Sequence, residues 1–154
     1  MELDAIDRSI LSVIQLDGRI TNAELADRVG LSPSACHRRL RQLESAGVID
    51  SYAALLKRAE VGRGVSVFIE ISLESQREEL LDDFERAIAE VPYVMSCHLM
   101  AGNADYLVHV TCRDVADYET VHREHIAVLP GVTRVRSNFA IRTVADTTAI
   151  DFGV

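Results

Sequence analysis

Hydrophobic residues recur at helical spacing along the first fifty residues of the chain. Ile6, Ile10 and Ile14 form a stripe at intervals of four, which predicts a first helix over residues 3–16. Cys36, Leu40 and Leu43 repeat at i, i+4 and i+7 in a later stretch, so they predict the buried face of another helix.

Two helix starts with a tight turn between them lie within residues 21–45. Thr21 is followed three residues later by Glu24, the spacing of a capping box in which each side chain accepts from the other residue's backbone amide. Gly30 can adopt the left-handed conformation that ends a helix. Ser32 followed by Pro33 is typical of the next helix start. The order predicts a helix-turn-helix unit.

The polar face of the second of these helices has the chemistry of a DNA-reading surface. Arginine can bind phosphate or the guanine edge, and serine can donate to phosphate. A solvated face on an ordinary helix pair is the alternative, but the Gly-x-Ser turn between two capped helices favours major-groove binding. The candidate DNA-binding residues are Ser34, His37, Arg38 and Arg41, with Arg39 at the edge of the stripe.

A change in pattern after this unit indicates a domain boundary. Residues 48–52 are β-prone and predict a small wing strand after Gly47. Residues 53–64 contain two glycines and are interpreted as a linker. The expected organisation is therefore a winged helix-turn-helix domain over 1–52, a linker over 53–64 and a second domain over 65–154.

From Val65 the hydrophobic period becomes two, which predicts β-strands. The resulting βαββαβ order predicts a ferredoxin-like domain, with helices on one face of an antiparallel sheet, and places the whole chain in the α+β class. Phe68 falls on the uncovered face, so we expect this domain to form a homodimer. The predicted strands are 65–73, 94–100, 106–112 and 132–144, and the predicted helices are 76–90 and 115–129.

Composition refines this prediction through the distribution of charge. The net charge of −8 is unusual for a DNA-binding protein, but residues 32–45 hold three arginines and one acid. One copy should bind DNA weakly, so useful affinity requires several copies on one duplex. Three scattered cysteines, no basic N-terminal leader and no apolar run of about 18 residues indicate a reduced, cytoplasmic protein.

Several motifs occur together in an order and spacing that identify a family. In the first half they are Leu3-Asp4, Asp17-Gly18-Arg19-Ile20, Val29-Gly30-Leu31-Ser32-Pro33-Ser34, Arg38-Arg39 and Gly47-Val48-Ile49; in the second half they are Gly102, Asp105-Tyr106-Leu107 and Leu129-Pro130-Gly131-Val132. With these motifs the chain resembles the leucine-responsive and asparagine-responsive (Lrp/AsnC) regulators along nearly its whole length. It departs from them at residues 55–59, where the family usually has a Leu-Asp-Pro-like linker.

This resemblance implies a bacterial transcription regulator whose second domain forms dimers, tetramers or octamers and binds an amino acid or a related metabolite. In the family the effector lies between dimers, against the loop of the central hairpin. Asp105 would suit an α-ammonium group and Gly102 would allow close approach, although both residue types also fit an ordinary hairpin turn. The implied effector residues are Leu99, Gly102, Asn103, Asp105, Tyr106, Asn138, Phe139 and Ala140.

Other chemistry is less well supported by the sequence. His122 and His125 lack an obvious third metal ligand, so they are interpreted as structural or surface histidines. A Cys97–His109 nucleophile pair lacks any sign of an oxyanion hole, so these two residues and His98 are interpreted as buried residues of the paired strands. We expect no metal, no cofactor other than an amino-acid effector, no membrane association and no enzymatic activity. A DNA-packaging protein without an effector, and more remotely an enzyme or amino-acid carrier, remain as alternatives.

Overall fold

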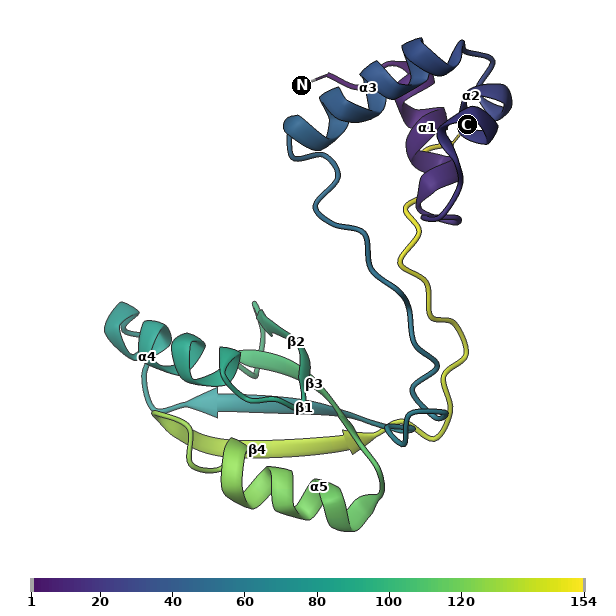
Figure 1. Ribbon diagram of the computed structural model, residues 1–154. Helices are drawn as coiled ribbons and strands as arrows, with labels where there is room; N and C mark the ends of the chain where they lie inside the picture. The colour runs from purple at the N-terminus through teal and green to yellow at the C-terminus, as the bar shows by residue number, and fades with distance from the viewer. Residues whose placement is uncertain (1, 154) are drawn as a thin grey trace. The chain divides into compact units, whose positions relative to one another are not determined.

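The computed structural model describes residues 2–153, which divide into two compact units (Figure 1). The first unit contains the described residues up to Leu55 together with those from Val144 onward, and the second is Leu56–Thr143. The sequence-based boundaries placed the C-terminal tail with the second domain. In the structure the tail instead groups with the first unit.

Three helices form the first unit, and each begins at a capping residue. They are α1 (Ala5–Ile14), α2 (Asn22–Arg28) and α3 (Pro33–Ser45). The capping box of Thr21 and Glu24 is formed, and the Ser32 hydroxyl accepts from the Ala35 amide at 3.3 Å. Helix α1 is shorter than predicted because Asp4 caps it, accepting from the Asp7 amide at 2.8 Å.

The core of this unit lies where the three helices meet. Ile10 from α1, Leu25 from α2, and Cys36 and Leu43 from α3 are almost completely buried. Gly30 adopts a φ of 68° between α2 and α3, the left-handed conformation expected at a helix end. The predicted helix-turn-helix and its apolar face are therefore present in the structure.

The predicted wing strand over 48–52 is not formed. The Val48 and Ile49 amides both donate to the Leu43 carbonyl, at 3.0 and 3.4 Å, so the end of α3 takes up the donors that a strand would need. The Tyr52 hydroxyl donates to Glu44 at 3.0 Å. These contacts hold the segment against α3 instead of pairing it as a strand.

The C-terminal tail is anchored to the three-helix unit. The Gln15 side chain donates to the Ile150 carbonyl at 2.7 Å and accepts from the Ile150 amide at 2.8 Å. Phe152 is half-buried and packs against the helical core. The tail thus contributes a hydrophobic residue and a two-point backbone contact to the first unit.

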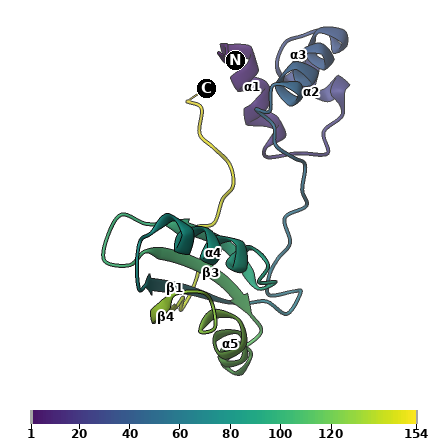
Figure 2. The same cartoon turned by 90° about the vertical axis from the view of Figure 1, so that its left-hand side faces the viewer.

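The second unit contains a four-stranded antiparallel sheet in the order β2-β3-β1-β4. Figure 2, turned by 90°, shows α4 against the strands. This topology is the predicted ferredoxin-like arrangement. Its elements are β1 (Val65–Leu73), α4 (Glu78–Ala89), β2 (Val94–Leu99), β3 (Tyr106–Cys112), α5 (Val115–Val121), a π-helical turn η1 (His122–Ile126) and β4 (Val132–Phe139).

Strand β4 ends five residues earlier than predicted. Its partner β1 begins at Val65, and the last backbone bond between the two segments runs from the Ala140 amide to the Ser66 carbonyl. Residues 141–144 have no neighbouring strand in the second unit, so their β-prone sequence cannot form a ladder.

The two faces of the sheet differ sharply. Val67, Ile69 and Ile71 of β1 are fully buried beneath α4 and α5, in one cluster with Phe84 and Val121. The opposite face, called here the open face, carries the intervening residues of β1 and their partners on β3 and β4. Phe68 lies there, 40% exposed, and stacks on His109 with ring centroids 4.6 Å apart.

A candidate DNA-binding helix and a polar pocket on the sheet

The outward face of α3 presents four of the predicted DNA-binding side chains. Ser34, His37, Arg38 and Arg41 are exposed, while Cys36 on the opposite face is buried. Arg41 forms a loose ion pair with Glu44, at 3.6 Å. Among residues 2–153, Arg38 forms no ion pair or side-chain hydrogen bond. The stripe is therefore available to phosphates and base edges.

Arg39 has a different role from its neighbours. Its guanidinium lies 2.8 Å from both Asp4 and Asp7, so it links α3 to the start of α1. The backbone hydrogen bond from Asp7 and then the Arg39 guanidinium lower the pKa of the Asp4 carboxyl. Arg39 therefore holds α3 to the start of α1, and its contact with DNA stays a prediction.

We expect Arg39→Ala to lower the thermal midpoint of the three-helix unit by a few degrees at pH 7, because it leaves the nearly buried Asp7 carboxylate without its cation. The lowered pKa of Asp4 means that its ionised form stabilises the fold above about pH 4, and that this contribution is lost as the pH falls through the lowered value. The difference in thermal midpoint between Arg39→Ala and the unsubstituted protein should therefore be smaller at pH 3 than at pH 7. Melting curves at the two pH values, with Arg8→Ala as an exposed control, test this.

The Asp105 carboxylate, which we predicted to bind the effector, already accepts hydrogen bonds from other residues of the chain. One carboxylate oxygen accepts from the Leu73 amide at 2.7 Å, and the other accepts from the Gln76 side chain at 2.7 Å. The Met100 amide also donates to the Asp105 carbonyl, at 2.8 Å. Asp105 therefore fixes the hairpin loop to the end of β1, and its contact with an effector stays a prediction.

We expect Asp105→Ala to destabilise the second unit by about 1–3 kcal/mol, since it removes two charge-assisted hydrogen bonds and strands the Leu73 amide. Urea unfolding followed by a sheet-sensitive signal measures this change. Asn103→Ala is the matched control, because Asn103 is exposed in the same loop. Equal stability of the two variants would contradict the structural role of Asp105.

Three other predicted effector residues lie on the helix side of the sheet. Tyr106 is buried, packs on Phe84 with ring centroids 4.4 Å apart, and donates its hydroxyl to Glu85 at 2.8 Å. Burial, together with the hydrogen bond to Glu85, raises the pKa of Tyr106. Phe139 packs edge-on against Tyr118 at 5.0 Å, and Leu99 pairs with Tyr106 at an exposed edge.

Asn138 is on the open face but lies away from the hairpin loop, and Ala140 directly follows the end of β4. Asn138 is opposite Phe68, whereas Tyr106, where the hairpin loop ends, is opposite Ile71. Three residues along β1 correspond to about 10 Å. The structure therefore does not bring Asn138 together with Gly102 and Asn103 within one chain.

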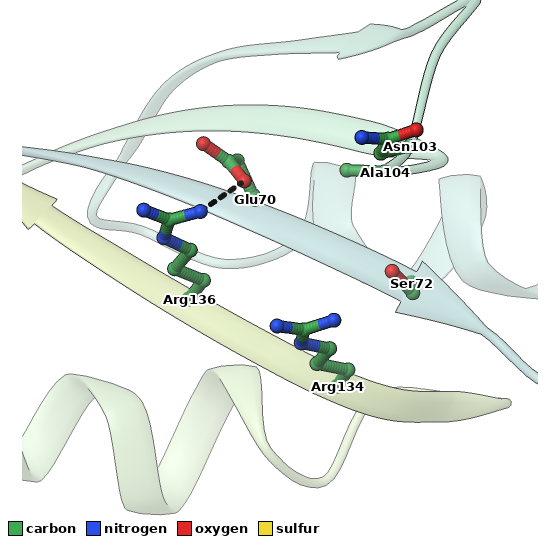
Figure 3. Close-up of a pocket in the computed structure, with 6 residues that line it drawn as sticks. All are labelled: Glu70, Ser72, Asn103, Ala104, Arg134 and Arg136. Carbon is green, nitrogen blue, oxygen red and sulfur yellow. Dashed lines mark ion pairs between the residues drawn. The ribbon is translucent and has the colours of Figure 1, made fainter.

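A polar pocket does lie beside the hairpin loop, on the open face. Its volume is about 170 Å³, and Figure 3 shows Arg134 and Arg136 rising from β4 towards it, with Asn103 and Ala104 facing them. Glu70 and Ser72 of β1 complete the lining. Asn103 is the one predicted effector residue among these six. The alternation of polar and apolar residues along β1 and β4 is the sequence signal that could have placed the four strand residues of this lining on one face. They are Glu70, Ser72, Arg134 and Arg136.

The Cys97–His109 pair weighed from the sequence is not formed. Cys97 is opposite Val108 and shares the helix side of the sheet with it, while His109 is on the open face, in contact with Phe68. Burial, with the nearby Glu85 carboxylate, raises the pKa of the Cys97 thiol to about 11. The thiolate needed for a nucleophile is therefore disfavoured. His98, expected to be buried, is exposed.

Two family profiles match the chain in the order of its two units. Residues 3–50 match the winged helix-turn-helix DNA-binding profile, and residues 66–150 match the Lrp/AsnC ligand binding domain. None of the helices within residues 2–153 combines the length and apolar character needed to cross a membrane.

Relatives and solved structures agree with these profiles. The Bkd operon transcriptional regulator of Pseudomonas aeruginosa is 40% identical over 93% of this chain and 94% of its own, and the leucine-responsive regulatory protein of Escherichia coli is 38% identical over 93% and 87%. A transcriptional regulator of Neisseria meningitidis in complex with L-Met has a TM-score of 0.92 at 37% identity, covering 97% of each chain. An AsnC family regulator of Agrobacterium tumefaciens has a TM-score of 0.94 at 35% identity, covering 98% of each. Together with the helix-turn-helix and the ferredoxin-like sheet, these matches place the chain in the Lrp/AsnC family of transcriptional regulators.

Proposed function

We propose that this protein is a cytoplasmic transcription regulator that reads DNA through the exposed stripe of α3 and responds to an amino acid bound by its second unit. The observation that carries the proposal is the outward stripe of Ser34, His37, Arg38 and Arg41 on a helix that is capped at Ser32 and buried on its other side. Such a helix fits the major groove and offers donors to both phosphates and bases.

The effector half of the proposal rests on the second unit. It matches a ligand binding domain, and the Neisseria relative is described as a complex with L-Met. In this chain the exposed loop residues Gly102 and Asn103 lie next to the polar pocket. Because Asn138 and Ala140 lie too far along the sheet in the same chain, we propose that they contribute to a site that a second copy completes.

We further propose that the protein is a homodimer through the open face, with larger assemblies built from dimers. Phe68 is 40% exposed on a face that no helix covers. Covering such a surface with a second sheet removes apolar area from water. Dimers would also place two weakly basic recognition helices on one duplex, which raises the overall affinity through effective concentration.

Gel shifts and sedimentation of the full chain, with and without each amino acid, test this function. We expect preference for particular DNA sites over random duplex and a ligand-dependent change in binding or assembly. Equal binding to all sequences with no response to any amino acid would instead support a DNA-packaging role. A monodisperse monomer at micromolar concentration would contradict the dimer.

A further inference from the structure

The exposed stripe of α3 ends beside a carboxylate that the proposed function leaves unused. Glu44 follows Arg41 by three residues, so the two side chains lie on the same side of the helix. The Nη1 atom of Arg41 is 3.6 Å from the Oε2 atom of Glu44. This separation is too long for a hydrogen bond, so the two groups attract each other by charge while the guanidinium keeps its N–H donors for DNA.

A tyrosine holds the other oxygen of the Glu44 carboxylate. The Tyr52 hydroxyl donates to Glu44 Oε1 at 3.0 Å. Burial, and then this hydrogen bond, raises the pKa of Tyr52, so the hydroxyl keeps its proton and remains the donor. The Tyr52 ring lies near the turn after α1, where a Cβ added to Gly18 would be 3.9 Å from the ring atom Cδ1. Glu44 is therefore held at one oxygen and presents the other to Arg41.

The two members of the ion pair differ in exposure. The Arg41 side chain is 71% exposed and can reach DNA, whereas the Glu44 side chain is only 29% exposed. An arginine that is already held in one orientation loses less rotamer entropy when it binds. An exposed ion pair contributes little to folding stability. The effect of this pair should therefore appear in DNA binding more than in the stability of the fold.

We propose that Glu44, held by Tyr52, is a positioning residue that orients Arg41 towards a base edge and so raises the preference for particular DNA sites. This inference rests on the proposed function and names a residue that sets the specificity of the stripe. On a preferred site, the carboxylate presents Arg41 for a bidentate contact with a guanine edge. On other sequences, its negative charge repels phosphates and offsets the charge of Arg41, which weakens binding whatever the sequence.

The test compares E44Q and Y52F in the full-length protein by fluorescence anisotropy on two duplexes. One is a site that the unsubstituted protein selects from a random library, and the other is a scrambled duplex of the same length. We expect E44Q to bind the selected site about threefold more weakly and the scrambled duplex about twofold more tightly. Y52F removes the hydrogen bond but no charge, so it should weaken only the selected site, by about twofold.

Two controls separate orientation from charge. D27N removes an exposed acid on α2, so its effect should have the same sign on both duplexes. The R41A and E44Q substitutions are also combined, because Glu44 is proposed to act through Arg41. In the R41A protein, E44Q should no longer weaken binding to the selected site. Melting curves of all variants confirm that they are folded under the assay conditions.

The remaining outcomes contradict the positioning role. Tighter binding of E44Q to both duplexes would show that Glu44 only repels DNA. Unchanged binding, an equal loss on both duplexes, or a loss that persists in the R41A protein would also overturn the inference. An unsubstituted protein that selects no site would overturn the proposed sequence-specific function, and this inference with it.

Discussion

Arg38→Ala should weaken specific DNA binding by about 1–3 kcal/mol for each DNA-bound subunit if the guanidinium contacts a base edge. Arg38 is exposed on α3 and has no ion pair within residues 2–153, so its side chain is free to enter a groove without breaking an internal contact. The folded state should be unaffected, because the buried face of α3 is formed by Cys36 and Leu43. Gel shifts on a preferred site and on random duplex, each at two salt concentrations, measure the effect.

The salt dependence distinguishes the kind of contact that Arg38 makes. A base contact should lower affinity for the preferred site more than for random duplex. A phosphate contact should weaken both alike and reduce the slope of log affinity against log salt by about one. Arg8→Ala on α1 is the control for a lost exposed charge in the same unit. Unchanged affinity in Arg38→Ala and in Arg41→Ala would mean that another face of the unit meets DNA.

Gly131→Ala should destabilise the second unit by about 2–5 kcal/mol, the largest stability effect that we expect from a single methyl group. Gly131 adopts a φ of 69°, which costs an L-residue roughly 1–2 kcal/mol. A Cβ there would also lie 2.7 Å from both terminal methyl carbons of Leu80 on α4, and overpacking adds roughly 1–3 kcal/mol. The Gly131 carbonyl accepts from the Glu74 amide at 2.9 Å, so the turn cannot move away freely.

Gly102→Ala is the matched control for this substitution. Gly102 does not adopt a positive φ, and a Cβ at this position would meet no atom within 4 Å. Its effect on stability should stay within about 0.5 kcal/mol. Thermal melting of the two variants gives the comparison. A similar midpoint for both would show that Leu80 and the turn relax more easily than their packing indicates.

The elements that the sequence predicted well are those with strong local signals. The cap at Thr21, the left-handed turn at Gly30 and the start of α3 at Ser32 depend on residues a few positions apart, and all three are formed. The alternation that began at Val65 likewise predicted a strand buried on one face. Each of these features follows from backbone geometry that neighbouring side chains determine.

The features that the sequence did not reveal depend on partners that are distant along the chain. Residues 48–52 have β propensity but no adjacent strand within their unit, and Arg39 is engaged by carboxylates more than thirty residues away. The Asp105 carboxylate accepts from the backbone amide of Leu73, 32 residues away, and the sequence alone does not reveal that bond. Which of Asn138 or Arg134 lies beside the hairpin loop depends on the register of β4 against β1, and periodicity alone does not give that register.

Because the C-terminal tail is anchored to the first unit, two chain segments connect the two units instead of one. The chain leaves the three-helix unit after Leu55 and returns to it at Val144, and the contact between Gln15 and Ile150 closes a loop of 135 residues. Most of that loop is the folded sheet unit, whose backbone is already fixed. Closing the loop therefore restricts only the segments that connect the two units, and its entropic cost is small. A single proteolytic cut in the exposed stretch 53–57 would therefore leave the two fragments associated through the tail, and separating them would require a second cut after Thr143.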